Sequence, residues 1–127
     1  MTQTKRVLIV EDNDKNRKLF RLLLNSLGCE CLVAANGSLG IELARDGRPD
    51  LILMDVQMPV LDGLSALALL RKDPRTAQIP VVAVTSYAME QDRERLLSAG
   101  FTDYLAKPVD TNQFKDIVCG ILDGKNA

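Results

Sequence analysis

The chain has 127 residues, of which 46% are hydrophobic and 26% charged, and its formal net charge is −1. This length fits one domain of an ordinary globular protein, and the near-zero charge with few aromatic side chains argues against a nucleic-acid or membrane-surface binder. No apolar run approaches the ~20 residues needed to span a bilayer, and the apolar stretch at the N-terminus is expected to form a first strand rather than a signal peptide.

Short apolar runs alternate with segments of helical period along the whole chain. The runs predict strands at residues 6–10, 30–34, 51–54, 81–84 and 101–105. The periodic segments predict helices at residues 14–27, 38–46, 64–72, 88–98 and 111–122, the last capped by Asp110 or Thr111. Nearly continuous apolar strands are typical of parallel sheets that are buried on both faces. The pattern predicts an α/β fold with a doubly wound five-stranded sheet, in a Rossmann-like or a flavodoxin-like strand order.

Polar residues follow four of the five predicted strands. They are Glu11-Asp12 after the first, Asp55 after the third, Thr85-Ser86 after the fourth and Lys107-Pro108 after the fifth. Each of these alone is commonly a helix cap, a turn or a solvated charge. Because the carboxyl ends of parallel strands meet at one edge of the sheet, we expect the four sets to converge on one crevice.

The chemistry of this crevice suits phosphoryl transfer. Three close carboxylates repel one another unless a cation joins them, and Mg²⁺ prefers such oxygen ligands. Lys107 and Thr85 add a positive charge and a hydroxyl donor, which complement the oxygens of a phosphoryl group. Asp55 is the candidate nucleophile, since carboxylates form aspartyl-phosphates.

The cysteine and histidine content argues against disulfide bonds, zinc sites and catalysis by a histidine base. Cys29, Cys31 and Cys119 are odd in number and lack a C-x-x-C spacing, so we expect free thiols in a reducing cytoplasm. The chain has no histidine, which removes the commonest general base and the usual zinc ligand.

The residues at these strand ends match a known family. The sequence resembles the receiver domains of two-component response regulators from about residue 5 to 122. The segments that carry the resemblance are VLIVEDN (7–13), DLILMDVQMP (50–59), DG (62–63), PVVAVTS (80–86) and GFTDYLAKP (100–108). The resemblance implies the CheY-like (βα)5 fold with strand order 2-1-3-4-5. It also implies that residues 1–127 are a stand-alone receiver without an output domain, most similar to DivK-like regulators.

The family's metal and phosphoacceptor positions map onto four residues. The resemblance implies that Asp55 takes a phosphoryl group from a phosphohistidine of a sensor histidine kinase or a histidine phosphotransfer protein. It implies that Mg²⁺, for which Mn²⁺ can substitute, binds Asp12, Asp55 and the backbone carbonyl of Gln57. Glu11 would act on the metal through water.

The family's switch positions map onto a second set. Thr85 and Lys107 would contact the phosphoryl group, Tyr104 would swing inward, and the Lys107–Pro108 peptide bond would be cis. Ser86 replaces a common alanine. Gln57 and Tyr87 lie two residues past Asp55 and Thr85, where family side chains flank the path of the attacking water, so they are expected to slow autodephosphorylation.

The resemblance also implies the partners. The kinase side would dock near Asn16 and Arg17, with Phe20 more simply interpreted as core. A downstream protein would bind the face made by the fourth helix, fifth strand and fifth helix, with the regulator a monomer or a weak phosphorylation-dependent dimer. The alternative role is a phosphorelay intermediate that passes its phosphoryl group to a second histidine phosphotransfer protein. An aspartyl phosphatase is disfavoured because the position of its second acid is Gln57, so no enzyme activity beyond the protein's own phosphorylation and dephosphorylation is expected.

Overall fold

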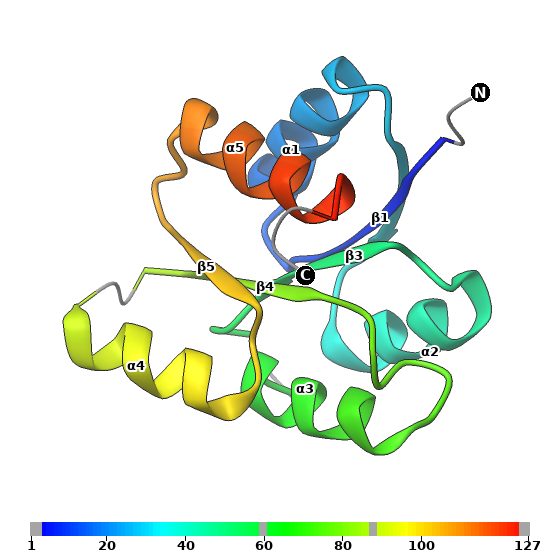
Figure 1. Cartoon of the computed structure of the whole chain (residues 1–127), viewed down its shortest axis with the longest axis vertical. Helices are drawn as coiled ribbons and strands as arrows, with labels where there is room; N and C mark the ends of the chain where they lie inside the picture. Colours follow the sequence, from blue (N-terminus) through cyan, green and yellow to red (C-terminus); the bar gives the residue numbers. More distant parts are fainter. Residues whose placement is uncertain (1–3, 59–60, 87–88, 125–127) are drawn as a thin grey trace.

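The computed structural model describes residues 4–58, 61–86 and 89–124. Over this part the chain forms five strands that alternate with five helices. The elements are β1 (Arg6–Val10), α1 (Asp14–Ser26), β2 (Glu30–Ala34), α2 (Gly37–Gly47), β3 (Leu51–Asp55), α3 (Gly63–Lys72), β4 (Val81–Thr85), α4 (Glu90–Ala99), β5 (Asp103–Ala106) and α5 (Thr111–Leu122). The strands pair in parallel in the order β2-β1-β3-β4-β5, which confirms the predicted doubly wound sheet and the flavodoxin-like choice (Figure 1).

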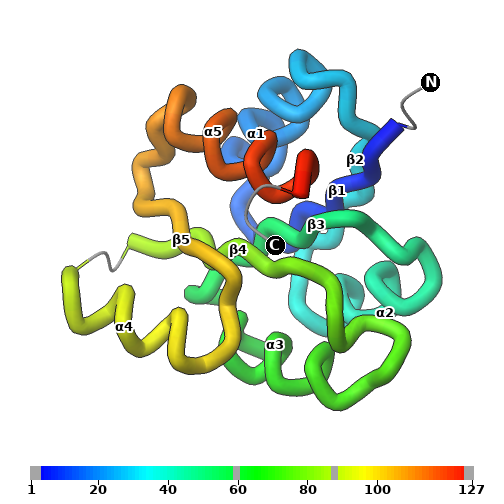
Figure 2. The backbone as a smooth tube through the Cα atoms, viewed as in Figure 1, coloured from blue at the N-terminus to red at the C-terminus, as the bar shows by residue number. Residues whose placement is uncertain are grey.

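Each face of the sheet carries its own layer of helices. In Figures 1 and 2, α1 and α5 lie over one face, and α2, α3 and α4 lie over the other. Successive strand residues alternate between the two layers: Val7 and Ile9 pack with α1 and α5, whereas Leu8 and Val10 pack with the opposite layer. Burial on both faces explains why the central strands are continuously apolar.

The helix boundaries follow capping chemistry. The side chains of Asn13, Asn36, Asp62 and Asp110 each accept a hydrogen bond from a backbone N–H in the first turn of the helix that follows. Asp110 is therefore the cap of α5, whose bounds match the prediction. The second helix includes Gly47, the predicted stop, as its last residue and is capped by Arg48, whose φ of 44° is left-handed.

The boundaries of β3, β4 and β5 differ from the prediction. Strands β3 and β4 each extend one residue further, to Asp55 and Thr85, because the backbone pairs Asp55 with Val84 and Thr85 with Ala106. β5 begins at Asp103, two residues later than predicted, although Phe101 is buried in the core. No helix in the part of the chain that the structure describes is long and apolar enough to cross a membrane.

Candidate functional site

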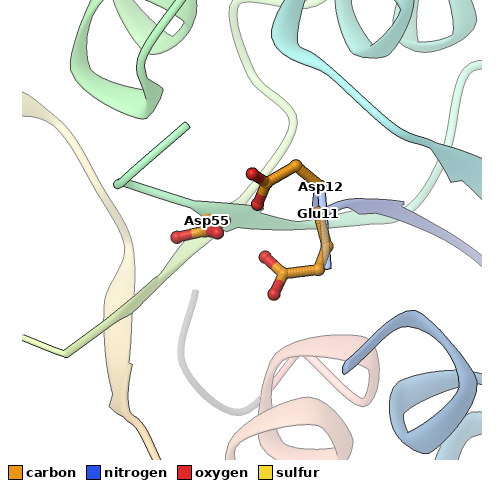
Figure 3. Close-up of side chains that lie close together, drawn as sticks. All are labelled: Glu11, Asp12 and Asp55. Carbon is orange, nitrogen blue, oxygen red and sulfur yellow. The ribbon is translucent and has the colours of Figure 1, made fainter. Parts of the chain in front are cut away.

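Three carboxylates gather where β1 and β3 end (Figure 3). Asp55 is the last residue of β3 and is 2% exposed; Glu11 follows β1 and is fully buried, whereas the adjacent Asp12 is exposed. One oxygen from each carboxylate lies within 4.8 Å of the others. The neighbouring places of β1 and β3 in the sheet produce this proximity, as the strand-end pattern predicts.

Lys107 compensates part of this negative charge. Its Nζ donates to Oδ2 of Asp55 at 3.1 Å and to Oε1 of Glu11 at 3.1 Å. The same Glu11 oxygen accepts a 2.6 Å hydrogen bond from Nδ2 of Asn16, on the first turn of α1. Lys107 directly follows β5. The backbone N–H of Lys107 donates to the carbonyl of Thr85 at 2.8 Å, which joins the ends of β4 and β5.

One ammonium does not fully offset two buried carboxylates. Burial raises the pKa of Asp55, and the neighbouring carboxylate of Glu11 raises it further, to about 6, against the lowering effect of Lys107. Burial alone would lower the pKa of Lys107, but Glu11 and Asp55 outweigh it and raise the pKa above the ordinary value. Lys107 is therefore protonated at neutral pH, and the site favours an additional positive charge.

The donor set fits a hard divalent cation. Oε2 of Glu11 is buried and has no hydrogen-bond partner among the described residues, and an unsatisfied buried carboxylate oxygen is costly. Glu11, Asp12 and Asp55 offer oxygen ligands only, with Asp12 on the solvent side, which suits Mg²⁺ with several retained waters.

Gln57 connects Asp55 to the end of β4. Its backbone N–H donates to Oδ1 of Asp55 at 3.0 Å. Its side-chain Nε2 donates to Oγ1 of Thr85 at 2.6 Å, and its Oε1 accepts from the backbone N–H of Ser86 at 3.2 Å. The loop after β3 is thus joined to the end of β4 through one carboxamide.

The remaining predicted positions lie along β5 and after β4. The Lys107–Pro108 peptide bond is cis, as the resemblance implies. Tyr104 on β5 is partly buried, and the guanidinium carbon of Arg93 on α4 lies 5.9 Å from the centre of its ring. Tyr87 lies outside the described residues.

Two residues contribute to the site in a way that the sequence does not predict. Asn16, a predicted kinase-docking residue, donates from its side chain to Glu11, and the guanidinium of Arg17 donates to the Glu11 carbonyl at 2.9 Å. The available signal in the sequence is their place in the first turn of α1, shortly after Glu11. Phe20 is core, as expected: it is 1% exposed and stacks on Phe114 with ring centres 5.7 Å apart.

The chain is similar in sequence to known proteins. The response regulator receiver domain family matches residues 7–119. The polar-differentiation response regulator DivK of Brucella anthropi is 44% identical over 118 residues, which cover 93% of this chain and 96% of that protein.

Solved structures share the fold. One is the receiver domain of sensor histidine kinase PA1611 from Pseudomonas aeruginosa PAO1, described with a magnesium ion coordinated in its active-site cleft. It superposes with a TM-score of 0.87 at 36% identity, over 95% of this chain and 99% of that one. The receiver domain of the Francisella response regulator 1452 gives a TM-score of 0.89 at 26% identity, over 96% and 99% of the two chains.

Proposed function

The chain belongs to the response regulator receiver domain family, and from this premise we propose that it accepts a phosphoryl group on Asp55 from the phosphohistidine of a sensor histidine kinase or a histidine phosphotransfer protein. The observation that carries this proposal is the setting of Asp55: a nearly buried carboxylate that is 3.1 Å from an ammonium and is gathered with two further acids. A helix cap or a structural ion pair does not need that combination.

The chemical step replaces one bond to phosphorus by another. A carboxylate oxygen of Asp55 attacks the phosphorus, the P–N bond to the donor imidazole breaks, and the imidazole leaves with the electron pair and takes up a proton. Because the pKa of Asp55 is raised only to about 6, most molecules carry the nucleophilic carboxylate at neutral pH. Lys107 offers its ammonium to the oxygens of the transferring group.

We propose that Asp12, Asp55 and the backbone carbonyl of Gln57 hold Mg²⁺ or Mn²⁺, with Glu11 acting through water. When bound, the ion supplies positive charge that offsets the phosphoryl oxygens. The all-oxygen donor set and the unsatisfied Oε2 of Glu11 support this assignment.

Phosphorylation of Asp55 would change the contacts of the residues around it. Thr85, with Ser86 beside it, and Lys107 would hold the new phosphoryl group, while Tyr104 reports the change at the face formed by α4, β5 and α5. We propose that a downstream protein binds this face. Phosphorylation can favour that complex only through contacts that differ between the two states.

We also propose a domain organisation, an oligomeric state and a cellular compartment for the protein. Residues 1–127 would form a single receiver domain with its core at 5–122, a monomer or weak phosphorylation-dependent dimer that acts in the cytoplasm through protein partners. The free thiols of Cys29, Cys31 and Cys119 support a reducing compartment. The kinase side would dock on α1 near Asn16 and Arg17.

Intact mass spectrometry after incubation with acetyl phosphate and Mg²⁺ tests the chemistry. The wild-type protein is expected to gain one phosphoryl group, the Asp55→Asn variant none, and an Asp116→Asn variant on the exposed surface of α5 the same as wild type. No gain in wild type with acetyl phosphate or with any phosphorylated histidine donor would overturn the proposal. Transfer from phosphorylated protein back to a histidine phosphotransfer domain would instead identify a phosphorelay intermediate.

A further inference from the structure

The side chain of Gln57 makes two hydrogen bonds to the end of β4. Nε2 donates to the Thr85 hydroxyl at 2.6 Å, and Oε1 accepts from the Ser86 N–H at 3.2 Å. Thr85 is 1% exposed and its bond to Gln57 is partly buried, whereas the bond from the Ser86 N–H lies at the exposed surface. We refer to this pair of bonds as the Gln57 tie.

The tie engages groups that a phosphoryl group on Asp55 would use. Asp55 lies two residues before Gln57, and its Oδ1 accepts from the Gln57 backbone N–H at 3.0 Å. Gln57 therefore contacts the Asp55 carboxylate through its backbone and the end of β4 through its carboxamide. The Ser86 N–H is a donor directed at an acceptor oxygen in this space, and the Thr85 hydroxyl lies beside it.

We propose that the Gln57 carboxamide occupies the place of the phosphoryl oxygens in the unphosphorylated protein, and that the Gln57 tie opposes phosphorylation until it is released. This inference rests on the proposed function of Asp55. Gln57 is then a positioning residue: it holds Thr85 and Ser86 in one arrangement and does not touch the reacting atoms through its side chain.

Release is favourable once the phosphoryl group is present. A phosphoryl oxygen carries negative charge, and charge-assisted hydrogen bonds are shorter and stronger than those of a neutral amide. The Ser86 N–H therefore exchanges the neutral Gln57 oxygen for a charged acceptor. The Thr85 hydroxyl, which accepts from the Gln57 amide in the tie, would instead donate to a phosphoryl oxygen. Because the tie exists only in the unphosphorylated state, it shifts the equilibrium toward that state by its own net contribution.

Removing the tie should make phosphoryl mimics bind more tightly. Two neutral hydrogen bonds of ordinary net strength, partly replaced by water, correspond to about 3- to 30-fold in affinity. Gln57→Leu keeps the size of the side chain and removes the amide. Gln57→Asn keeps the amide but withdraws it by about 1.5 Å, one C–C bond, which is enough to lose both contacts.

The probe is beryllium fluoride, which binds a carboxylate oxygen through beryllium and presents three fluorine acceptors. Its dissociation constant at fixed Mg²⁺ is measured by two-dimensional amide NMR for wild type, Gln57→Leu, Gln57→Asn and the control Gln113→Leu on the exposed face of α5. Both Gln57 variants are expected to bind 3- to 30-fold more tightly, and the control to match wild type. Equal or weaker binding by both variants would overturn the proposal.

Amide hydrogen exchange of Ser86, measured without Mg²⁺ or fluoride, tests the tie itself. Exchange is expected to be several-fold faster in both Gln57 variants and unchanged in the control, a local signature that general destabilisation would not confine to one amide. If wild type binds beryllium fluoride but the Ser86 amide exchanges at the same rate in wild type and in both Gln57 variants, the Gln57 tie is overturned. Failure of wild type to bind the mimic at all would instead overturn the function of Asp55, and the opposing role with it.

Discussion

Replacing Asp55 by asparagine is expected to stabilise the metal-free protein at neutral pH, although it abolishes the proposed chemistry. The carboxyl group is 2% exposed, and burial together with Glu11 raises its pKa from 3.8 to about 6. The folded state therefore carries the Asp55 charge at a cost that the unfolded chain does not bear.

The magnitude follows from this shift. Two pKa units correspond to about 3 kcal/mol of unfolding free energy, already reduced by the attraction of Lys107. Asparagine removes the charge but can present its single oxygen either to Lys107 or to the Gln57 N–H, so about 1 kcal/mol of hydrogen bonding is lost. The net gain at pH 7 is expected to be about 2 kcal/mol.

The sign of the pH dependence gives a second check. Below pH 3.8 Asp55 is protonated in both folded and unfolded wild type, and no penalty exists. Between 3.8 and about 6 the folded protein retains a proton that the unfolded chain releases, so wild-type stability falls as pH rises. The advantage of Asp55→Asn should grow across this window and level off above it.

Urea unfolding followed by circular dichroism, in EDTA at half-unit steps from pH 4.5 to 8, measures this difference. The exposed Asp116→Asn variant serves as control and is expected to remain within about 0.5 kcal/mol of wild type throughout. An Asp55→Asn variant that is no more stable than wild type at pH 7, or whose advantage is the same at every pH, would refute the reasoning.

Three further predictions concern the metal, the glycine that packs against the backbone of Asp55, and the side chains expected to flank the path of the attacking water. Mg²⁺ at ten times its dissociation constant should raise wild-type unfolding free energy by about 1.4 kcal/mol, and Asp12→Asn should lose most of this gain; equal gains would argue against Asp12 as a ligand. In Gly63→Ala, an added Cβ would lie 2.7 Å from the backbone oxygen of Asp55 and 2.8 Å from Cα of the next residue. The free energy of unfolding should fall by about 1–3 kcal/mol, and labelling by acetyl phosphate should be slower. Gly47→Ala is the control, because its Cβ meets only the tip of the Leu32 side chain. Identical behaviour of the two variants would contradict this prediction. Replacing Gln57 or Tyr87 by alanine should shorten the lifetime of the phosphorylated protein, measured as loss of label; unchanged decay in both variants would remove them from the path of water.

The sequence predicted the element order and the convergence of the site, but not the last residue of the central strands. Asp55 and Thr85 are polar residues that follow apolar runs. A prediction based on side-chain polarity therefore ends each strand one residue too early. The structure extends both strands because backbone pairing continues regardless of the side chain, with Asp55 opposite Val84 and Thr85 opposite Ala106. Ladder hydrogen bonds join N–H and C=O groups, which every residue other than proline provides.

The contacts inside the site were predictable only in part. Topology brings the ends of parallel strands together, so the meeting of Glu11, Asp55 and Lys107 followed from their positions after three strands. The bond from Gln57 to Thr85 joins residues 28 apart and depends on one rotamer of a flexible side chain. No periodicity in the sequence encodes such a choice.

β5 links the site to the face formed by α4, β5 and α5. The ammonium of Lys107, which follows β5, pairs with Glu11 and Asp55. The Lys107 backbone N–H donates to the Thr85 carbonyl, which joins the ends of β4 and β5. Tyr104, three residues earlier, carries Arg93 of α4 over its ring. α4 has one fully buried residue, Leu96, and so holds its place through few apolar contacts. We expect a change in charge at Asp55 to alter the contacts of Lys107, and we expect α4, which has few buried residues and contacts β5 through Tyr104, to respond. The site and the proposed output face are therefore connected by the shortest strand of the sheet.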